Sequence, residues 1–311
     1  MAKLRVSVVE FLNTAPLVWG FTDGPLAGKY DLSFTVPSRC AEALQRNDAD
    51  VAIIPSIEYQ RIPGMVALPG MAIAAKHEVR SLLVVAKRPI HRVTRLALDT
   101  SSRSTAALVR ILCKEHWKIS PEFVDAAPDP SAMLAEADAA LVIGDPALSI
   151  SLKMEALAAK AAPIEPDDCC SGDLEEMPVP GVETIFVYDV AFEWRQMTGK
   201  PSVLALWTAR PDVVTAELVA DFQASKAYGL ARAREIAEAA SIKLDLPPLA
   251  LERYLTDNIN FDLDAENLAG LDLYYRHAAA LGLIPRARPV EFANFGAAAE
   301  TMNPVAGRAK R

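Results

Sequence analysis

The stretch 99–105, DTSSRST, holds the densest set of side chains that could bind a ligand. It follows a short apolar segment, 96–98, and precedes a segment with apolar residues at helical spacing, 106–112. This order predicts a strand, a turn, and a helix that begins with hydroxyl groups. The free N–H groups and the dipole at such a helix start attract a carboxylate or a phosphate. A well-capped helix and an anion site explain the pattern equally well.

Two further polar residues stand where predicted strands end. Asn13 follows the strand predicted over 4–9, where a side-chain amide is well placed for a ligand cleft or could cap the next helix. Asp145 follows the buried strand 139–143 within Gly-Asp-Pro. We expect Asp145 mainly to cap the helix that begins at Pro146, with contact to a ligand as the alternative.

The remaining candidates point to no metal or nucleotide chemistry. Asp99 is expected to orient the serine-rich turn. Arg39, Arg80 and Arg103 either offset charge in a cleft or lie at the surface, as single arginines usually do. The four histidines and four cysteines show no metal-ligand spacing, and there is no glycine-rich phosphate loop or dinucleotide fingerprint. The sequence therefore predicts neither a metal nor a cofactor.

Composition limits the class of protein. The chain has 311 residues, 51% hydrophobic and 23% charged, with a net charge of −8. The acidic balance argues against a nucleic-acid partner or an anionic membrane surface, but a local pocket can still bind a small anion. We see no secretory leader, no apolar run of the roughly 20 residues that a membrane span needs, and no disulfide pattern. We therefore expect a cytoplasmic protein, and the sequence does not indicate its oligomeric state.

The order of elements predicts two α/β lobes. Strands and helices alternate over the first ~60 residues, which is typical of parallel sheets. A strand at 30–36, a helix capped by Ser38, and C-terminal helices near 216–240, 248–258 and 266–281 complete this reading. We place lobe 1 at residues 1–78 and 208–311, and lobe 2 at residues 79–207. Two crossings between lobes indicate a type II periplasmic-binding-protein-like fold, with the ligand between the lobes.

Several separated motifs then resemble one enzyme family. The chain is similar to the chorismate dehydratases of the futalosine route to menaquinone, the MqnA family, over roughly residues 4–285. The matching stretches are Phe11–Leu17, Asp50–Tyr59 (DVAIIPSIEY), Val79–Ser81, Leu98–Ser104 (LDTSSRS), Leu141–Leu148 (LVIGDPAL), Phe192–Trp207 and Tyr254–Leu263.

The resemblance implies a hydro-lyase, a carbon–oxygen lyase, that converts chorismate to 3-[(1-carboxyvinyl)oxy]benzoate and water. It also implies a site for two carboxylates. We expect the helix start, with Ser101, Ser102, Ser104 and Thr105, to bind one of them, and Ser81 and Ser56 to bind the other. Asn13 would be the catalytic residue that orients the substrate, whose own enolpyruvyl carboxylate takes the proton from C3. Asp145 is a further candidate for substrate binding.

Two other functions remain open at this point. The sister enzyme, 1,4-dihydroxy-6-naphthoate synthase, shares the fold and is expected to use a histidine in the cleft. Only His77 lies near a predicted crossing between lobes, which favours the dehydratase. A non-catalytic protein that binds a small anion is the second alternative, and such a transport protein should carry a leader or a lipid anchor.

Overall fold

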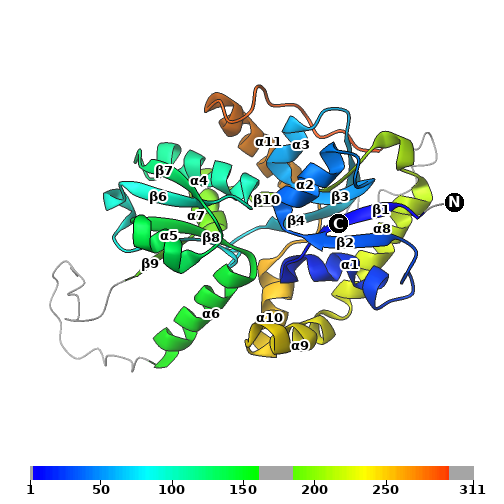
Figure 1. Cartoon of the computed structure of the whole chain (residues 1–311), viewed down its shortest axis with the longest axis horizontal. Helices are drawn as coiled ribbons and strands as arrows, with labels where there is room; N and C mark the ends of the chain where they lie inside the picture. The colour runs from blue at the N-terminus through cyan, green and yellow to red at the C-terminus, as the bar shows by residue number, and fades with distance from the viewer. Residues whose placement is uncertain (1–2, 161–184, 294–311) are drawn as a thin grey trace, which may run out of the picture.

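Each of the two lobes folds around its own five-stranded sheet (Figure 1). The structure, a computed structural model, describes residues 3–160 and 185–293. The predicted loop 167–180, with Cys169 and Cys170, and the tail 296–311 lie outside these residues. The first sheet contains β1 (Arg5–Val9), β2 (Asp31–Thr35), β3 (Val51–Pro55), β4 (Val66–Ala75) and β10 (Ser202–Ala209). The second contains β5 (Leu82–Ala86), β6 (Arg95–Asp99), β7 (Glu122–Ala126), β8 (Ala139–Ile143) and β9 (Phe186–Asp189).

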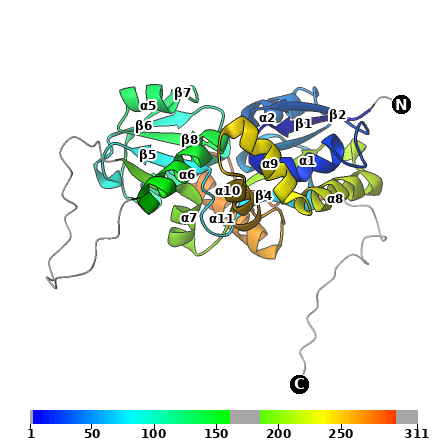
Figure 2. The ribbon, with the colours of Figure 1, turned by 90° about the horizontal axis from the view of Figure 1, so that it is seen from below.

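Helices cover both sheets. Lobe 1 carries η1 (Leu12–Thr14), α1 (Ala15–Thr22), α2 (Pro37–Gln45), α3 (Ser56–Arg61), η3 (Pro211–Val213), α8 (Ala216–Leu230), α9 (Ala233–Leu244), α10 (Pro248–Arg253), η4 (Tyr254–Asn258) and α11 (Ala265–Ala280). Lobe 2 carries η2 (Ile90–Arg92), α4 (Arg103–Glu115), α5 (Pro130–Glu136), α6 (Gly144–Lys160) and α7 (Val190–Thr198). Figure 2 shows α9 and α10 beside the junction between the lobes.

The two sheets share a pattern that follows from the crossings. Their strand orders are β2-β1-β3-β10-β4 and β7-β6-β8-β5-β9. β10 runs antiparallel to β3 and β4, and β5 runs antiparallel to β8 and β9, whereas the pairs of β1 and of β6 are parallel. β5 and β10 are the strands that arrive from the other lobe. Each enters its sheet at the cleft, where the parallel strands end, and so must run the opposite way.

Alternating side chains of β5 show where the core of lobe 2 lies. Leu82 and Val84 join a large buried cluster that also contains residues of α4 and α7, while Leu83 and Val85 face a smaller cluster under α5 and α6. Because strand side chains alternate between faces, one apolar strand fills both layers. In lobe 1, Phe222 of α8 packs edge-to-face against Phe21 of α1 and Trp207 of β10.

The predicted two-lobed α/β fold is confirmed, with three local corrections. The second crossing comes before Ser202 rather than at residue 207, because β10 lies entirely in the first sheet. The helix predicted over 216–240 is two helices that meet at 231–232, just after Gly229. Ser38 is not an N-cap: Val36 holds that position, and the Ser38 amide donates instead to the Ser101 carbonyl across the cleft (3.2 Å).

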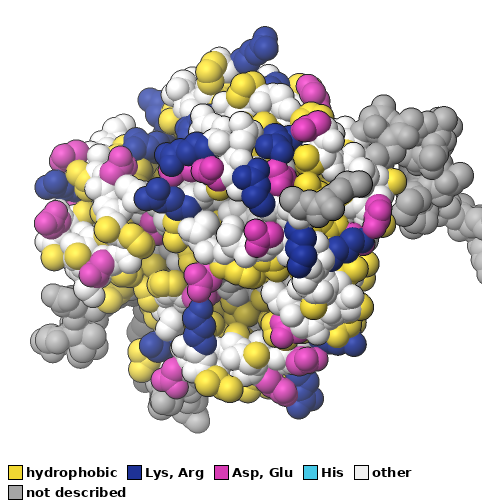
Figure 3. All heavy atoms as spheres, turned by 45° about the vertical axis from the view of Figure 1, so that its right-hand side comes forward, with side chains coloured by type: hydrophobic (Ala, Val, Ile, Leu, Met, Phe, Trp, Pro, Cys, Tyr) yellow, Lys and Arg dark blue, Asp and Glu magenta, His cyan; other side chains and the backbone are white. Residues whose placement is uncertain are grey.

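Charges of both signs are interspersed over the face seen in Figure 3, where hydrophobic side chains also line a hollow. In the part of the chain that the structure describes, no helix is long and apolar enough to cross a membrane. Cys40 and Cys113 are buried and unpaired with each other. Burial raises the pKa of the Cys40 thiol to about 11 and that of Cys113 to about 12, so neither is a reactive thiolate near neutral pH.

Candidate active site

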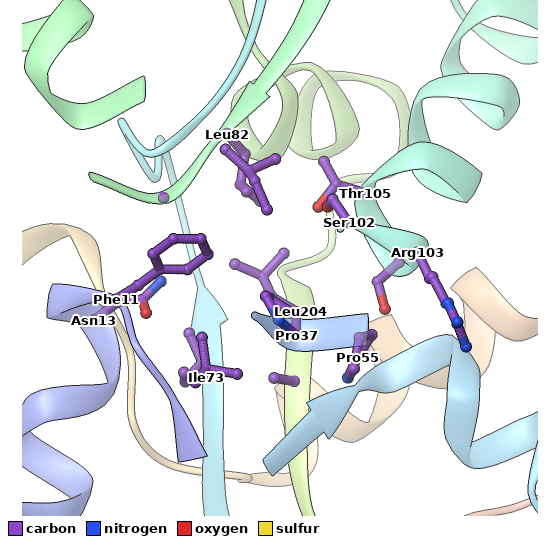
Figure 4. Close-up of a pocket in the computed structure, with 15 residues that line it drawn as sticks. Phe11, Asn13, Pro37, Pro55, Ile73, Leu82, Ser102, Arg103, Thr105 and Leu204 are labelled. Atoms are coloured by element: carbon purple, nitrogen blue, oxygen red, sulfur yellow. The ribbon is translucent and has the colours of Figure 1, made fainter. Parts of the chain in front are cut away.

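A cavity between the lobes collects the ends of strands from both sheets (Figure 4). The space between its side chains is about 470 Å³, a volume that includes open solvent. Its walls are mainly apolar, formed by Val9, Phe11, Pro37, Pro55, Ile73, Leu82, Ile143, Leu204 and Ala205. A planar unsaturated ring is the kind of ligand that such a slot can accommodate.

The polar end of the cavity is the first turn of α4. Ser102, Ser104 and Thr105 line it, and Figure 4 shows the hydroxyls of Ser102 and Thr105 pointing inward. Ser102 is the N-cap residue, yet its side chain caps no amide. Within the described residues, the backbone N–H groups of residues 103–105 donate to no protein acceptor. These amides and the helix dipole together form a site for an anionic group.

Asp99 shapes this turn from behind. Its Oδ1 accepts from the Ser101 amide (2.8 Å) and from the Ser101 hydroxyl (2.6 Å), which confirms the predicted orienting role. Ser101 is therefore turned toward Asp99 and does not line the cavity. Burial raises the pKa of Asp99, and the hydrogen bonds from Ser101 act in the opposite direction.

Asn13 faces the helix start from lobe 1. It lies in η1, is buried, and lines the cavity beside Phe11 (Figure 4). Its Oδ1 accepts a long hydrogen bond from the Thr14 hydroxyl (3.3 Å). One amide therefore offers a donor and an acceptor to a ligand.

A buried pair next to Asn13 was missed by the sequence analysis. The Tyr254 hydroxyl donates to Ser81 Oγ (2.8 Å). Burial raises the pKa of Tyr254, while Ser81 and Asn13 act in the opposite direction, so this phenol stays protonated. Tyr254 lies within a stretch quoted for the family resemblance, but no spacing around it in the sequence indicates a polar role. Ser81 is fully buried, and its neighbour Leu82 is the residue that lines the cavity.

Ser56 does not reach the cavity. Its hydroxyl donates to the Val203 carbonyl of β10 (2.7 Å) and lies 3.2 Å from the Ser104 hydroxyl. Ser104 Oγ also accepts from the Ile57 amide (3.1 Å). These bonds fasten α4 to lobe 1, so the expected role of Ser56 in holding a carboxylate is replaced by a structural one.

Asp145 does not cap its own helix. Its Oδ1 accepts from the Leu12 amide (2.9 Å), which belongs to lobe 1. The carboxylate lines a neighbouring hollow between α1 and α9 rather than the cavity itself. Burial raises the pKa of Asp145, and the bond from Leu12 lowers it in part.

Arg103 also lines the cavity, beside Ser102 and Ser104 (Figure 4), and it joins the two lobes. Its Nη1 lies 3.0 Å from Glu58 Oε2 and its Nη2 lies 2.8 Å from Glu42 Oε1. Both acids belong to lobe 1, and Glu58 also pairs with Arg61 (2.7 Å). The guanidinium is therefore already neutralised, and an anion in the cavity must rely on amides and hydroxyls. We call Arg103, Glu42 and Glu58 the interlobe clasp.

Metal and histidine chemistry find no support among the described residues. No group of three or more His, Cys, Asp or Glu side chains there is placed to hold a metal ion. No histidine of the described ranges lines the cavity, and His77 is exposed.

Solved structures show which fold this chain has. Protein AF1704 from Archaeoglobus fulgidus is 17% identical with a TM-score of 0.66, and covers 91% of this chain and 98% of its own. The periplasmic aliphatic sulphonate binding protein SsuA from Escherichia coli is 13% identical with a TM-score of 0.57, and covers 99% and 96%. The chain has the two-lobed fold of periplasmic binding proteins, with its cavity between the lobes.

The family is narrower than the fold. A family described as menaquinone biosynthesis matches residues 4–164 and 174–280, and this chain belongs to it. A curated relative, the chorismate dehydratase of Thermus thermophilus, is 28% identical over 250 residues, which are 80% of this chain and 85% of the relative. The resemblance noted in the sequence is thereby confirmed.

Proposed function

We propose that this protein dehydrates chorismate to 3-[(1-carboxyvinyl)oxy]benzoate, as the first step of futalosine-dependent menaquinone synthesis. Family membership and the Thermus relative support this hydro-lyase activity. The observation that carries the proposal is the cavity itself, with the first turn of α4 at one end, the amide of Asn13 at the other, and apolar walls between. We further propose a cytoplasmic location, as expected for a biosynthetic enzyme.

The arrangement suits a ring with carboxylates at its edge. One carboxylate would bind the amides of α4 with the hydroxyls of Ser102 and Thr105, since hydrogen bonds to a charged acceptor are the strong ones. The ring would fill the slot between Phe11 and Leu204. The enolpyruvyl group would then lie toward Asn13, with Ser81 and Tyr254 behind it.

The main contribution of the protein to this reaction is to position the substrate. A proton leaves C3 and hydroxide leaves C4, the ring becomes aromatic, and one water is released. We propose that the enolpyruvyl carboxylate of the substrate takes the C3 proton while Asn13 holds it in line. Positioning of this kind lowers barriers by about 7–11 kcal/mol in favourable cases. No side-chain base is then needed, which agrees with a cavity lined by hydroxyls, an amide, the guanidinium of Arg103 and apolar groups.

Incubation of the purified protein with chorismate tests the proposal. We expect an aromatic product lighter than chorismate by one water, followed by absorbance and mass spectrometry, with heat-denatured protein as the control. Binding without turnover would indicate an anion-binding protein instead. Failure with chorismate together with release of dihydroxynaphthoate from its own precursor would indicate the sister enzyme, which the absence of histidine from the described cavity lining disfavours.

A further inference from the structure

The turn that carries Asn13 has no cap of its own. In η1 the N-cap position belongs to Phe11, whose side chain cannot accept a hydrogen bond. The first amide of the turn, that of Leu12, is satisfied by Asp145 Oδ1 at 2.9 Å. Capping carboxylates normally belong to the same helix end, two or three residues away. Here the acceptor comes from α6, in the other lobe.

A second contact between the same two segments supports the first. Gly144 precedes Asp145 and has a positive φ of 66°, which favours glycine. A Cβ atom at this position would lie 2.7 Å from the ring of Phe11. The ring therefore rests against the backbone of residue 144. Residues 11 and 12 meet residues 144 and 145 by van der Waals contact and by a hydrogen bond, directly beside Asn13.

We propose that Asp145 is a positioning residue. It fixes the orientation of the Asn13 side chain only when the two lobes are in contact. Its carboxylate caps the Leu12 amide across the cleft and thereby holds η1 in the conformation that presents Asn13 to the cavity. When the lobes separate, this amide loses its acceptor and the turn is free to relax. This inference rests on the proposed function, because it assigns Asn13 the role of orienting the substrate.

The surroundings of Asp145 fit a role through the backbone rather than direct contact with substrate. The side chain lines the hollow between α1 and α9, not the cavity beside α4. Glu10 and Lys243 are the charged groups that act on it, and they pair with each other at 3.3 Å. An anionic substrate would be repelled by a carboxylate, whereas a backbone N–H is an ideal partner for one.

Three variants separate these roles. Asp145→Ala removes the acceptor, and Asp145→Asn keeps a side-chain oxygen that can accept from Leu12. Asp129→Ala is the matched control, because Asp129 caps α5 by accepting from the amides of Ser131 and Ala132, away from the cleft. We expect Asp145→Ala to lower kcat for chorismate about 10- to 100-fold with KM within threefold, as for a misplaced catalytic group. Asp145→Asn should recover most of kcat, and Asp129→Ala should leave it unchanged.

Amide hydrogen exchange tests the contact without any assay of turnover. We expect the Leu12 amide to be protected in the wild type and in Asp129→Ala, and to exchange at least about 10 times faster in Asp145→Ala. Unchanged protection of Leu12 would overturn the inference. So would a raised KM with unchanged kcat in Asp145→Ala, which would mean contact with substrate, or an Asp145→Asn enzyme as slow as Asp145→Ala. If the wild type fails to dehydrate chorismate, the proposed function is wrong. The hydrogen exchange of the Leu12 amide would still show whether Asp145 bonds to it.

Discussion

Asn13 is the polar side chain that lobe 1 contributes to the cavity lining, within the residues described. An amide cannot act as a strong base, so its contribution must come from holding a group in place. Tyr254 and Ser81 behind it are buried and bonded to each other, which leaves the amide few alternative positions. Catalysis by positioning is sensitive to small displacements, because a shift of about 1 Å can cost roughly 10²-fold in rate.

Replacing Asn13 by alanine should therefore reduce kcat far more than binding. We expect kcat for chorismate to fall about 100-fold or more, with KM within a few-fold, measured by steady-state kinetics. A melting curve close to that of the wild type would show that the fold is intact. Turnover that survives the substitution would remove Asn13 from the mechanism.

The hydrogen-bonding role of a single residue could be predicted from the sequence only where its partner lies close to it in the chain. Asp99 was expected to orient the serine turn, and its partner Ser101 is two residues away. Asp145 was expected to cap its own helix, but its partner Leu12 is 133 positions away, and Ser56 bonds to Val203 at a separation of 147. Local spacing carries no information on such contacts, because the first depends on how the lobes meet and the second on how β10 joins the first sheet.

At the scale of elements, the first turn of α4 divides into two kinds of hydroxyl. Those of Ser102 and Thr105 point into the cavity (Figure 4). That of Ser101 donates to Asp99. Only the first kind is available to a ligand. In this short segment, the hydroxyls of Ser102 and Thr105 therefore serve ligand binding, whereas the hydroxyl of Ser101 serves the stability of the turn.

Thr105→Val keeps the shape of the side chain and removes its hydroxyl. We expect KM for chorismate to rise about 10-fold or more, because a hydrogen bond to a charged group contributes about 1.5–3 kcal/mol. The matched control is Ser101→Ala, which should lower the melting temperature and leave KM within a few-fold. Equal effects of both variants on KM would contradict the assignment of the anion site to the cavity side of the turn.

Asp50 ties the start of β1 to the end of β10. Its carboxylate accepts from the amide and guanidinium of Arg5 (2.8–3.2 Å) and from Arg210 Nη2 (2.5 Å). The hydrogen bonds from Arg5 lower its pKa, with the charge of Arg210 adding to the effect. The folded pKa lies below the unfolded value of about 3.9, so this stabilisation is present above that pH and is lost as the pH falls through the folded pKa.

Asp50→Asn should therefore destabilise the protein at pH 7 and matter less in acid. We expect a loss of about 1–2 kcal/mol in the free energy of unfolding at pH 7, allowing for screening, measured by urea denaturation. The difference in the free energy of unfolding between Asp50→Asn and the wild type should become smaller by pH 3. Substitution of the exposed Asp23 by asparagine is the control. A difference in unfolding free energy that stays constant with pH would contradict the assignment of this pH-dependent stability to the Asp50 carboxylate.

Elements were easier to predict than their boundaries. Apolar runs identified β3, β5 and β8 because both faces of these strands are covered. The helix α7 ends at Gly199, which has a φ of 68°, as its glycine predicts. Gly199 and Pro201 precede β10, and Gly229 precedes the break between α8 and α9, but these residues do not indicate which sheet a strand joins or whether a helix stops.

At the scale of the whole molecule, the lobes meet on both sides of the cavity. Residues 11–12 contact 144–145 on one side, and the interlobe clasp lies on the other. Glu58 is 3% exposed, so the clasp places a buried carboxylate against a cation from the opposite lobe. Removal of Arg103 would leave Glu58 and Glu42 with cationic partners from lobe 1 alone. The clasp therefore favours the arrangement in which α4 and Asn13 face the same cavity.

Arg103→Gln should favour separation of the lobes. We expect a larger radius of gyration by small-angle X-ray scattering and a KM for chorismate raised about 10-fold, since closure must then be driven by substrate alone. Arg39→Gln is the matched control, because Arg39 pairs with Glu42 within α2. A clasp variant as compact and as active as the wild type would show that these ion pairs do not govern closure.

A crystal structure of Asn13→Ala with chorismate tests the central claim most directly, because this variant should bind the substrate and turn it over slowly. The account predicts one carboxylate within about 3 Å of the first-turn amides of α4, and the enolpyruvyl group directed toward position 13. Chorismate bound with neither carboxylate at that helix start, or bound outside the cavity between the lobes, would contradict it.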